Sequence, residues 1–241
     1  MTERAGKIRL FVDAALAEGA RLALGRPQAH YLMGVMRLGA GAAVAVFNGR
    51  DGEWRAILQP QGRRDAVLEI AEQTVPMRVP PDLWLIFAPI RKARTDFVAE
   101  KATELGVRRI QPVITRHTRS DRLNTDRLRA HAIEAAEQCG AVFLPEVVDP
   151  APLDRVLADW PPDRALIFCD EARDAPLLSR VAPPAPAAIL IGPEGGFAPE
   201  EAAVLKARSQ AVAVSLGPRI LRTDTAAIAA IALWQAERGD W

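Results

Sequence analysis

Two segments in the C-terminal half combine glycine turns with charged side chains in a pattern that suits ligand binding. The first runs from Ile189 to Phe197 and reads Ile-Leu-Ile-Gly-Pro-Glu-Gly-Gly-Phe. Its apolar start predicts a buried strand, and the glycines that follow let the backbone approach a ligand and turn amides toward it. No Gly-Lys-Ser/Thr follows, and the carboxylate of Glu194 would repel phosphates, so a triphosphate-binding loop is excluded. A tight glycine turn without a ligand is the alternative.

The second segment, Ser215 to Ala226, carries two arginines where a helix is predicted to begin. Thr223 or Asp224 could cap that helix. Capping does not explain Arg219 and Arg222, because the helix dipole disfavours cations at a helix N-terminus. We therefore expect these arginines to face an anion or a developing negative charge.

The composition of the 241 residues is that of a globular protein. Hydrophobic residues make up 49%, and 31 Lys+Arg balance 30 Asp+Glu, which excludes a disordered chain and a polyanion-binding tail. Two cysteines, Cys139 and Cys169, and three histidines give no disulfide framework and predict no metal site. No signal-peptide pattern and no membrane-spanning run is present, so we expect a cytoplasmic protein without a membrane partner.

The elements that must position these segments fall on either side of a proline-rich seam at Thr74 to Pro81. Before the seam, short strands and turns predict a β-rich domain over residues 1–75. The expected strands are Ile8–Val12, Val44–Phe47, Trp54–Gln59 and Val67–Ala71, with a turn at Asn48–Gly52 and a helix at Pro27–Arg37.

After the seam, strands alternate with helices, which predicts an α/β domain with a mostly parallel sheet over residues 76–241. The expected strands are Leu83–Ala88, Arg109–Thr115, Ala165–Cys169, Ala188–Ile191 and Ala211–Leu216, and the expected helices are Thr95–Leu105, Asn124–Cys139 and Thr223–Arg238. The last helix is apolar on several faces, which favours burial in the core or at a subunit interface.

Arginines also gather between positions 108 and 129. The segment holds Arg108, Arg109, Arg116, Arg119, Arg122, Arg127 and Arg129 against Asp121 and Asp126. Arginine binds phosphate in a bidentate fashion, so the pattern suits a polyanion, and a solvated surface explains it equally well.

Together, the two glycine-containing segments resemble the SPOUT superfamily of knotted RNA methyltransferases. Within it, they are most similar to the bacterial enzymes that methylate N3 of a uridine, uracil-1498 of 16S rRNA. Two internal signatures, Lys101–Val107 and Ile133–Gln138, look like those of that family. Arg9–Val12, His30–Leu32 and Val35–Leu38 look like its small PUA-like RNA-binding domain.

The resemblance implies a fold, a cofactor and partners. Residues 1–75 would form a PUA-like barrel, and residues 76–241 an α/β SPOUT domain with a trefoil knot that binds S-adenosylmethionine. The protein would act as a homodimer on 16S rRNA within the 30S subunit. The implied cofactor contacts are Leu190, Ile191, Gly192, Pro193, Glu194, Gly195, Gly196, Ser215, Leu216, Gly217, Ile220, Leu221 and Thr225.

Methylation of uridine N3 requires loss of its proton, so the site needs a base or a cation that stabilises the uridine anion. Arg222 is the candidate for holding the anion or its phosphate, and Glu194 for the base or positioning carboxylate. The alternative is that the Glu194 carboxylate accepts hydrogen bonds within its own loop. The expected RNA contacts are Arg9, Arg37, Arg91, Arg94, Arg116 and Arg119.

Two positions depart from the family pattern. Asp224 stands where the family more often has Glu, and Cys139–Ala141 stands where the family usually supplies a serine and an arginine. Two other functions remain open. One is methylation of a ribose 2′-hydroxyl or of another base in rRNA or tRNA. The other is a non-catalytic role in RNA binding or ribosome assembly, which needs neither glycine segment.

Overall fold

The chain folds into two compact units in a computed structural model that describes residues 8–119, 123–170 and 175–241. The first unit holds the chain up to Val79 together with Ala136–Leu144, and the second holds Pro80–Ala135 and Pro145–Trp241. The first passage between the units lies inside the proline-rich seam. The return of Ala136–Leu144 to the first unit has no counterpart in the sequence pattern.

None of the described helices is long and apolar enough to cross a membrane.

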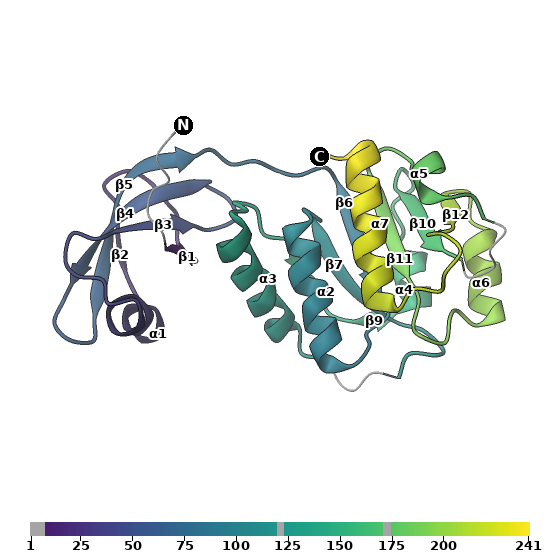
Figure 1. Ribbon diagram of the computed structural model, residues 1–241, viewed down its shortest axis with the longest axis horizontal. Helices are drawn as coiled ribbons and strands as arrows, with labels where there is room; N and C mark the ends of the chain where they lie inside the picture. The colour runs from purple at the N-terminus through teal and green to yellow at the C-terminus, as the bar shows by residue number, and fades with distance from the viewer. Residues whose placement is uncertain (1–7, 120–122, 171–174) are drawn as a thin grey trace. The chain divides into compact units, whose positions relative to one another are not determined.

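The first unit is built on a five-stranded sheet with the strand order β1-β3-β4-β5-β2 (Figure 1). Strands β1 and β3 are parallel, and the other neighbours are antiparallel. Its elements are β1 (Arg9–Phe11), β2 (Arg21–Ala23), α1 (Arg26–His30), the π-helical turn η1 (Tyr31–Val35), β3 (Ala43–Phe47), β4 (Glu53–Pro60) and β5 (Ala66–Val75). The four predicted strands are confirmed, and β2 was missed because three residues carry too little periodicity.

The predicted turn between β3 and β4 is confirmed and depends on two residue types. The Asn48 side-chain oxygen accepts hydrogen bonds from the backbone N–H groups of Arg50 and Asp51, at 2.9 and 2.8 Å. Gly52 has a φ of 78°, and a Cβ there would lie 2.2 Å from the Val75 carbonyl oxygen. Only glycine therefore closes this turn.

Arg9 is a structural residue of the first unit. Its guanidinium pairs with Glu53 at 2.7 Å and stacks on the Phe47 ring, 4.4 Å from the centroid. It also donates to the backbone oxygens of Ala136 and, at 2.9 Å, Ala141. Since the side chains of Arg9 and Glu53 are only 12% and 8% exposed, this network fixes Ala136–Leu144 to the sheet.

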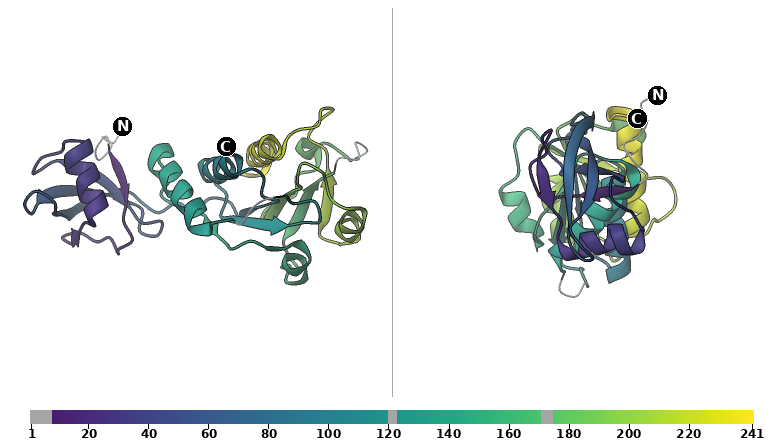
Figure 2. Two further views of the ribbon diagram at one scale, coloured as in Figure 1. Left: turned by 90° about the horizontal axis from the view of Figure 1, so that it is seen from below. Right: turned by 90° about the vertical axis from the view of Figure 1, so that its left-hand side faces the viewer.

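The second unit is a parallel sheet with the order β12-β10-β11-β6-β7-β8 and with β9 paired to β7. Helices α2, α3 and α7 lie on one face, and α4 and α6 on the other (Figure 2). The strands are β6 (Leu83–Phe87), β7 (Arg109–Ile114), β8 (Glu146–Val147), β9 (Ala151–Pro152), β10 (Ala165–Cys169), β11 (Ala187–Ile191) and β12 (Ala211–Val214). The helices are α2 (Lys92–Glu104), α3 (Thr125–Cys139), α4 (Leu153–Ala158), α5 (Leu178–Val181), α6 (Pro199–Lys206) and α7 (Thr223–Arg238).

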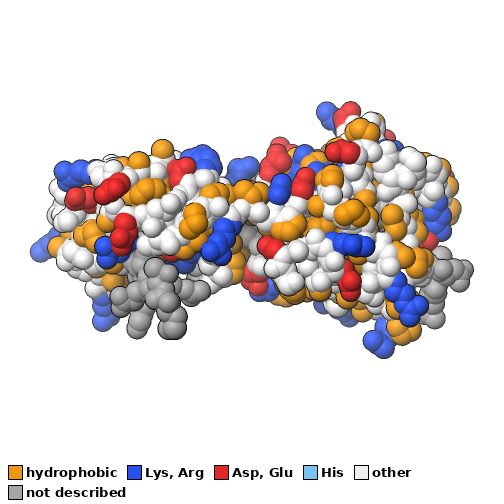
Figure 3. Space-filling model, turned by 90° about the horizontal axis from the view of Figure 1, so that it is seen from above, with side chains coloured by type: hydrophobic (Ala, Val, Ile, Leu, Met, Phe, Trp, Pro, Cys, Tyr) orange, Lys and Arg blue, Asp and Glu red, His pale blue; other side chains and the backbone are white. Residues whose placement is uncertain are grey.

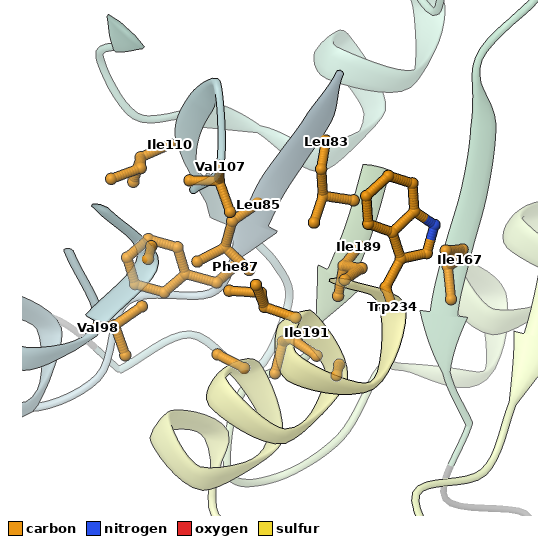
Figure 4. Close-up of a cluster of buried hydrophobic side chains, with 14 of the residues drawn as sticks. Leu83, Leu85, Phe87, Val98, Val107, Ile110, Ile167, Ile189, Ile191 and Trp234 are labelled. Atoms are coloured by element: carbon orange, nitrogen blue, oxygen red, sulfur yellow. The ribbon is translucent and has the colours of Figure 1, made fainter. Parts of the chain in front are cut away.

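Alternation along the central strands divides the core of this unit into two layers. Residues Leu83, Leu85 and Phe87 of β6 pack with α2 and α7, whereas Ile86 packs with α4 and α6 on the other face. Figure 4 shows the first layer, in which the fully buried Trp234 of α7 lies among strand residues. The last helix is thus a core helix, one of the two locations expected for it.

The network around Arg9 predicts a large loss of stability on substitution. Arg9→Ala removes the ion-pair partner of the buried Glu53 carboxylate and the hydrogen bonds to the Ala136 and Ala141 carbonyls, so we expect the free energy of unfolding to fall by about 3–5 kcal/mol. Urea unfolding of the full chain measures it. The control is Arg50→Ala, whose ion pair with Asp13 is exposed and 3.8 Å long, and whose loss should cost less than about 1 kcal/mol. Equal losses for both variants would contradict a structural role for Arg9.

Candidate functional site

A cavity of about 670 Å³ in the second unit lies at the carboxyl ends of β10, β11 and β12. Because the three strands are parallel and adjacent, the segments that follow them leave the sheet at the same edge. Both glycine-containing segments therefore line one cavity, together with residues at the start of α2 and α7.

The glycine turn after β11 is closed by its own backbone and tied to α7. The Gly196 N–H donates to the Pro193 carbonyl at 2.9 Å, with Gly196 at a φ of 67°. The Thr223 hydroxyl donates to the Gly192 carbonyl at 3.1 Å, which joins the two segments. Gly192 also leaves room for the Phe197 ring, which would lie 3.1 Å from a Cβ at that position.

The loop that follows β7 supports the glycine turn. His117 Nδ1 lies 3.1 Å from the Gly195 carbonyl oxygen and 3.2 Å from that of Gly196. Both partners are acceptors, so Nδ1 must carry the proton for these hydrogen bonds to form. The Glu201 carboxylate accepts from the backbone N–H of Arg116 at 2.8 Å and thereby holds the same loop against α6. The sequence gives no local signal for this contact, because the partners lie far apart in the chain.

Four arginines line the cavity, and two of them are the arginines that we expect to face an anion or a developing negative charge. They are Arg91, Arg94, Arg219 and Arg222. Arg94 pairs with Asp224 at 3.1 Å, which leaves that carboxylate engaged in the first turn of α7. Arg219 and Arg222 are exposed, and among the described residues neither has an ion-pair partner.

Two carboxylates and one thiol also line the cavity. Asp170 pairs with Lys206 at 2.6 Å. Glu194 is exposed on the glycine turn, and within the described part of the chain no hydrogen bond to its carboxylate is present, so the alternative of a loop-internal acceptor finds no support. Burial raises the pKa of the Cys169 thiol to about 12, which disfavours the thiolate near neutral pH.

Most of the predicted cofactor contacts line this cavity, and two do not. Leu190 is fully buried and packs toward α4 and α6, because alternation along β11 turns it away from the neighbouring Ile191. Thr225 is exposed, since the helical period brings Thr223 and Ala226 to the cavity instead. Sequence reasoning missed Thr223, Ala226, Phe197 and the end of β10 as residues that line the cavity. The lining residues that it expected are Ile191, Gly192, Pro193, Glu194, Gly195, Gly196, Ser215, Leu216, Gly217, Ile220, Leu221 and Arg222.

The arginines between positions 108 and 129 do not form one binding surface. Arg109 pairs with Glu146 and stacks on Trp84, and Arg127 pairs with Asp96. Arg108 and Arg129 also bind protein partners, Arg116 and Arg119 are exposed, and Arg122 and Asp121 lie outside the described residues. On the face shown in Figure 3, Lys and Arg side chains are scattered among acidic and hydrophobic ones.

The expected RNA contacts differ in their surroundings. Arg91 and Arg94 lie at the cavity, Arg37 is exposed with a φ of 53°, and the buried network of Arg9 leaves its guanidinium little access to RNA. We therefore leave Arg9 out of the RNA-binding surface proposed below. Among the residues that the structure describes, no group of three or more His, Cys, Asp or Glu could hold a metal ion.

Two family models and several known proteins match this chain. Residues 78–235 match the family model described as an RNA methyltransferase domain, and residues 24–71 match an RNA methyltransferase PUA domain. Ribosomal RNA small subunit methyltransferase E of Rickettsia conorii is 29% identical over 229 residues, which cover 93% of each chain.

Two solved structures share the whole fold. The ribosomal RNA small subunit methyltransferase E from Neisseria gonorrhoeae, bound to S-adenosyl methionine, matches with a TM-score of 0.87 and 29% identity over 97% of this chain and 99% of that one. A methyltransferase from Legionella pneumophila in complex with the same cofactor matches with 30% identity, the same TM-score and the same coverage. The chain therefore belongs to the RNA methyltransferase family whose curated members are named ribosomal RNA small subunit methyltransferase E.

Proposed function

We propose that this protein transfers a methyl group from S-adenosylmethionine to N3 of a uridine of the U1498 type in 16S rRNA. The proposal includes a trefoil knot in the second unit, a cytoplasmic homodimer, and the 30S subunit as the substrate. One observation carries it: both glycine segments line a single cavity, which also holds an exposed carboxylate and two arginines that pair with no described carboxylate.

The residues at the cavity fit S-adenosylmethionine. Ile191, Leu216 and Leu221 offer apolar surface, and the glycine turn presents backbone groups to a polar ligand. Glu194 places negative charge at the cavity, where a cation is to be held, whereas the charge of Asp170 is balanced by Lys206. When bound, the cofactor supplies an electrophilic methyl group on a sulfonium.

Side chains of the protein then have to accept the proton of uridine N3 and stabilise the negative charge on the uracil ring. Uridine N3 loses its proton as the N–CH₃ bond forms, and Glu194 is the candidate acceptor because its carboxylate is exposed and lacks a partner among the described residues. Arg222 and Arg219 would stabilise the negative charge that spreads onto the uracil ring. Arg94 and Asp224 neutralise each other and would hold the start of α7 in place.

A cofactor-binding experiment tests the location of the site. Gly195→Arg should abolish S-adenosylmethionine binding in isothermal titration calorimetry, because a long side chain there enters the cavity. Gly195→Ala is the matched control, since a Cβ at this position meets His117 at an ordinary 3.5 Å and should leave affinity within a few fold. Binding by the arginine variant, or none by the unmodified protein, would refute this assignment.

A methylation assay tests the role of Arg222. With unmethylated 30S subunits and the cofactor, Arg222→Ala should lower kcat by about 10²–10³-fold, because stabilisation of the anion is lost. RNA binding should remain mostly intact, and a parallel fall in RNA affinity would make Arg222 an RNA anchor instead. Mass spectrometry of the product identifies the methylated atom, and a 2′-O-methylated ribose or another methylated base would replace the N3 assignment.

The contact of His117 with the glycine turn predicts a positioning effect. His117→Ala removes the hydrogen bonds to Gly195 and Gly196, so we expect cofactor affinity to fall about 3–10-fold. Titration calorimetry measures it. Arg116→Ala is the control, because Arg116 binds Glu201 through its backbone N–H, which the substitution retains. Unchanged affinity of the His117 variant would show that the turn holds its shape without this side chain.

A further inference from the structure

The first unit contains a hollow of about 290 Å³ that none of the functions above uses. Arg26, His30, Met33 and Gly34 line it from α1 and η1, and Arg63 and Arg64 line it from the connection between β4 and β5. The two segments are far apart in the sequence, so only the fold reveals this cluster. Apart from Met33 and Gly34, every lining residue carries a basic group.

The arginines of this hollow differ from others in the same unit. Arg50 pairs with Asp13 and Arg55 with Glu72. In the described portion of the chain, by contrast, no carboxylate lies within ion-pairing distance of the three hollow arginines, and Asp65, next to Arg64, makes no ion pair either. Arginines that line one hollow without an ion-pair partner among the described residues repel one another, and a bound anion relieves that repulsion.

Local backbone geometry shapes the wall of the hollow. A Cβ at position 34 would lie 2.7 Å from His30 Nδ1, so glycine allows the imidazole ring to rest against the turn. Residues Tyr31–Val35 form a π-helical turn, and Arg37, just beyond it, holds a φ of 53°. Both features are uncommon and are concentrated at functional sites in proteins.

We propose that this hollow binds a phosphate of the RNA backbone, with Arg63 and Arg64 as its principal donors and Arg26 and His30 beside them. The inference rests on the proposed function, because it takes RNA to be the substrate. The volume of the hollow is at the lower end of the range for small-molecule pockets, which suits one phosphate with its sugar. Phosphate contacts position RNA without reading its sequence, so this site would add affinity and no base specificity.

The test compares two double variants of the full chain in binding a single-stranded oligoribonucleotide across a salt series. Arg63→Ala with Arg64→Ala should weaken binding equally for the substrate sequence and for a scrambled one. The slope of log affinity against log salt should become shallower by about 0.7 for each arginine removed, the value for a single strand. The matched control is Arg50→Ala with Arg55→Ala, which removes the same charge from the same unit and should leave the slope nearly unchanged.

Three outcomes would overturn the proposal: equal slope changes in both double variants, no change in the hollow variant, or weaker binding to anionic lipid vesicles with unchanged RNA affinity. Circular dichroism checks that both variants fold. Calorimetry with S-adenosylmethionine separates this inference from the proposed function. If the unmodified protein binds no cofactor, the methyltransferase proposal fails, while the salt slopes still decide whether the hollow binds RNA.

Discussion

Parallel pairing of β10 with β11 on one side and β12 on the other brings together two stretches of chain, one with Glu194 and one with Arg219 and Arg222. Because these strands run in one direction, their following loops emerge at one edge, where the glycine turn and the start of α7 share a cavity. The hydrogen bond from the Thr223 hydroxyl to the Gly192 carbonyl fixes their mutual distance. The cavity exists because of this convergence.

Ion pairs balance some of the charged side chains around the cavity. Arg94 with Asp224 and Lys206 with Asp170 form ion pairs at its walls. Among the described residues, Arg219, Arg222 and Glu194 stay outside these pairs, so both signs of charge are present in one cavity. Methyl transfer from a sulfonium to a deprotonated nitrogen needs both, since a cation is consumed and an anion must be stabilised on the way.

Outside the cavity, arginines have different surroundings in this chain, and each environment indicates a different purpose. Arg9 is buried against Glu53 and backbone carbonyls, so it stabilises the first unit. Arg109 and Arg127 pair with neighbouring carboxylates on the second unit. Arg63 and Arg64 line a hollow and have no ion-pair partner in the part of the chain that the structure describes. A count of arginines in the sequence does not distinguish these purposes.

The sequence by itself determined most elements and the two functional segments, because hydrophobic periodicity and glycine turns are local properties. The bounds of β10 and α7 agree with the expected Ala165–Cys169 and Thr223–Arg238. Short elements such as β2 and α4 were beyond that reasoning, because a few residues hold too little pattern.

Only the tertiary structure decided which side chains meet. It brought His117 to the glycine turn, turned Leu190 and Thr225 away from the cavity, and divided the arginines of positions 108–129 among separate partners. The physical reason is that these contacts join residues far apart in the chain. Strand pairing and helix packing fix their geometry, and no local pattern records either.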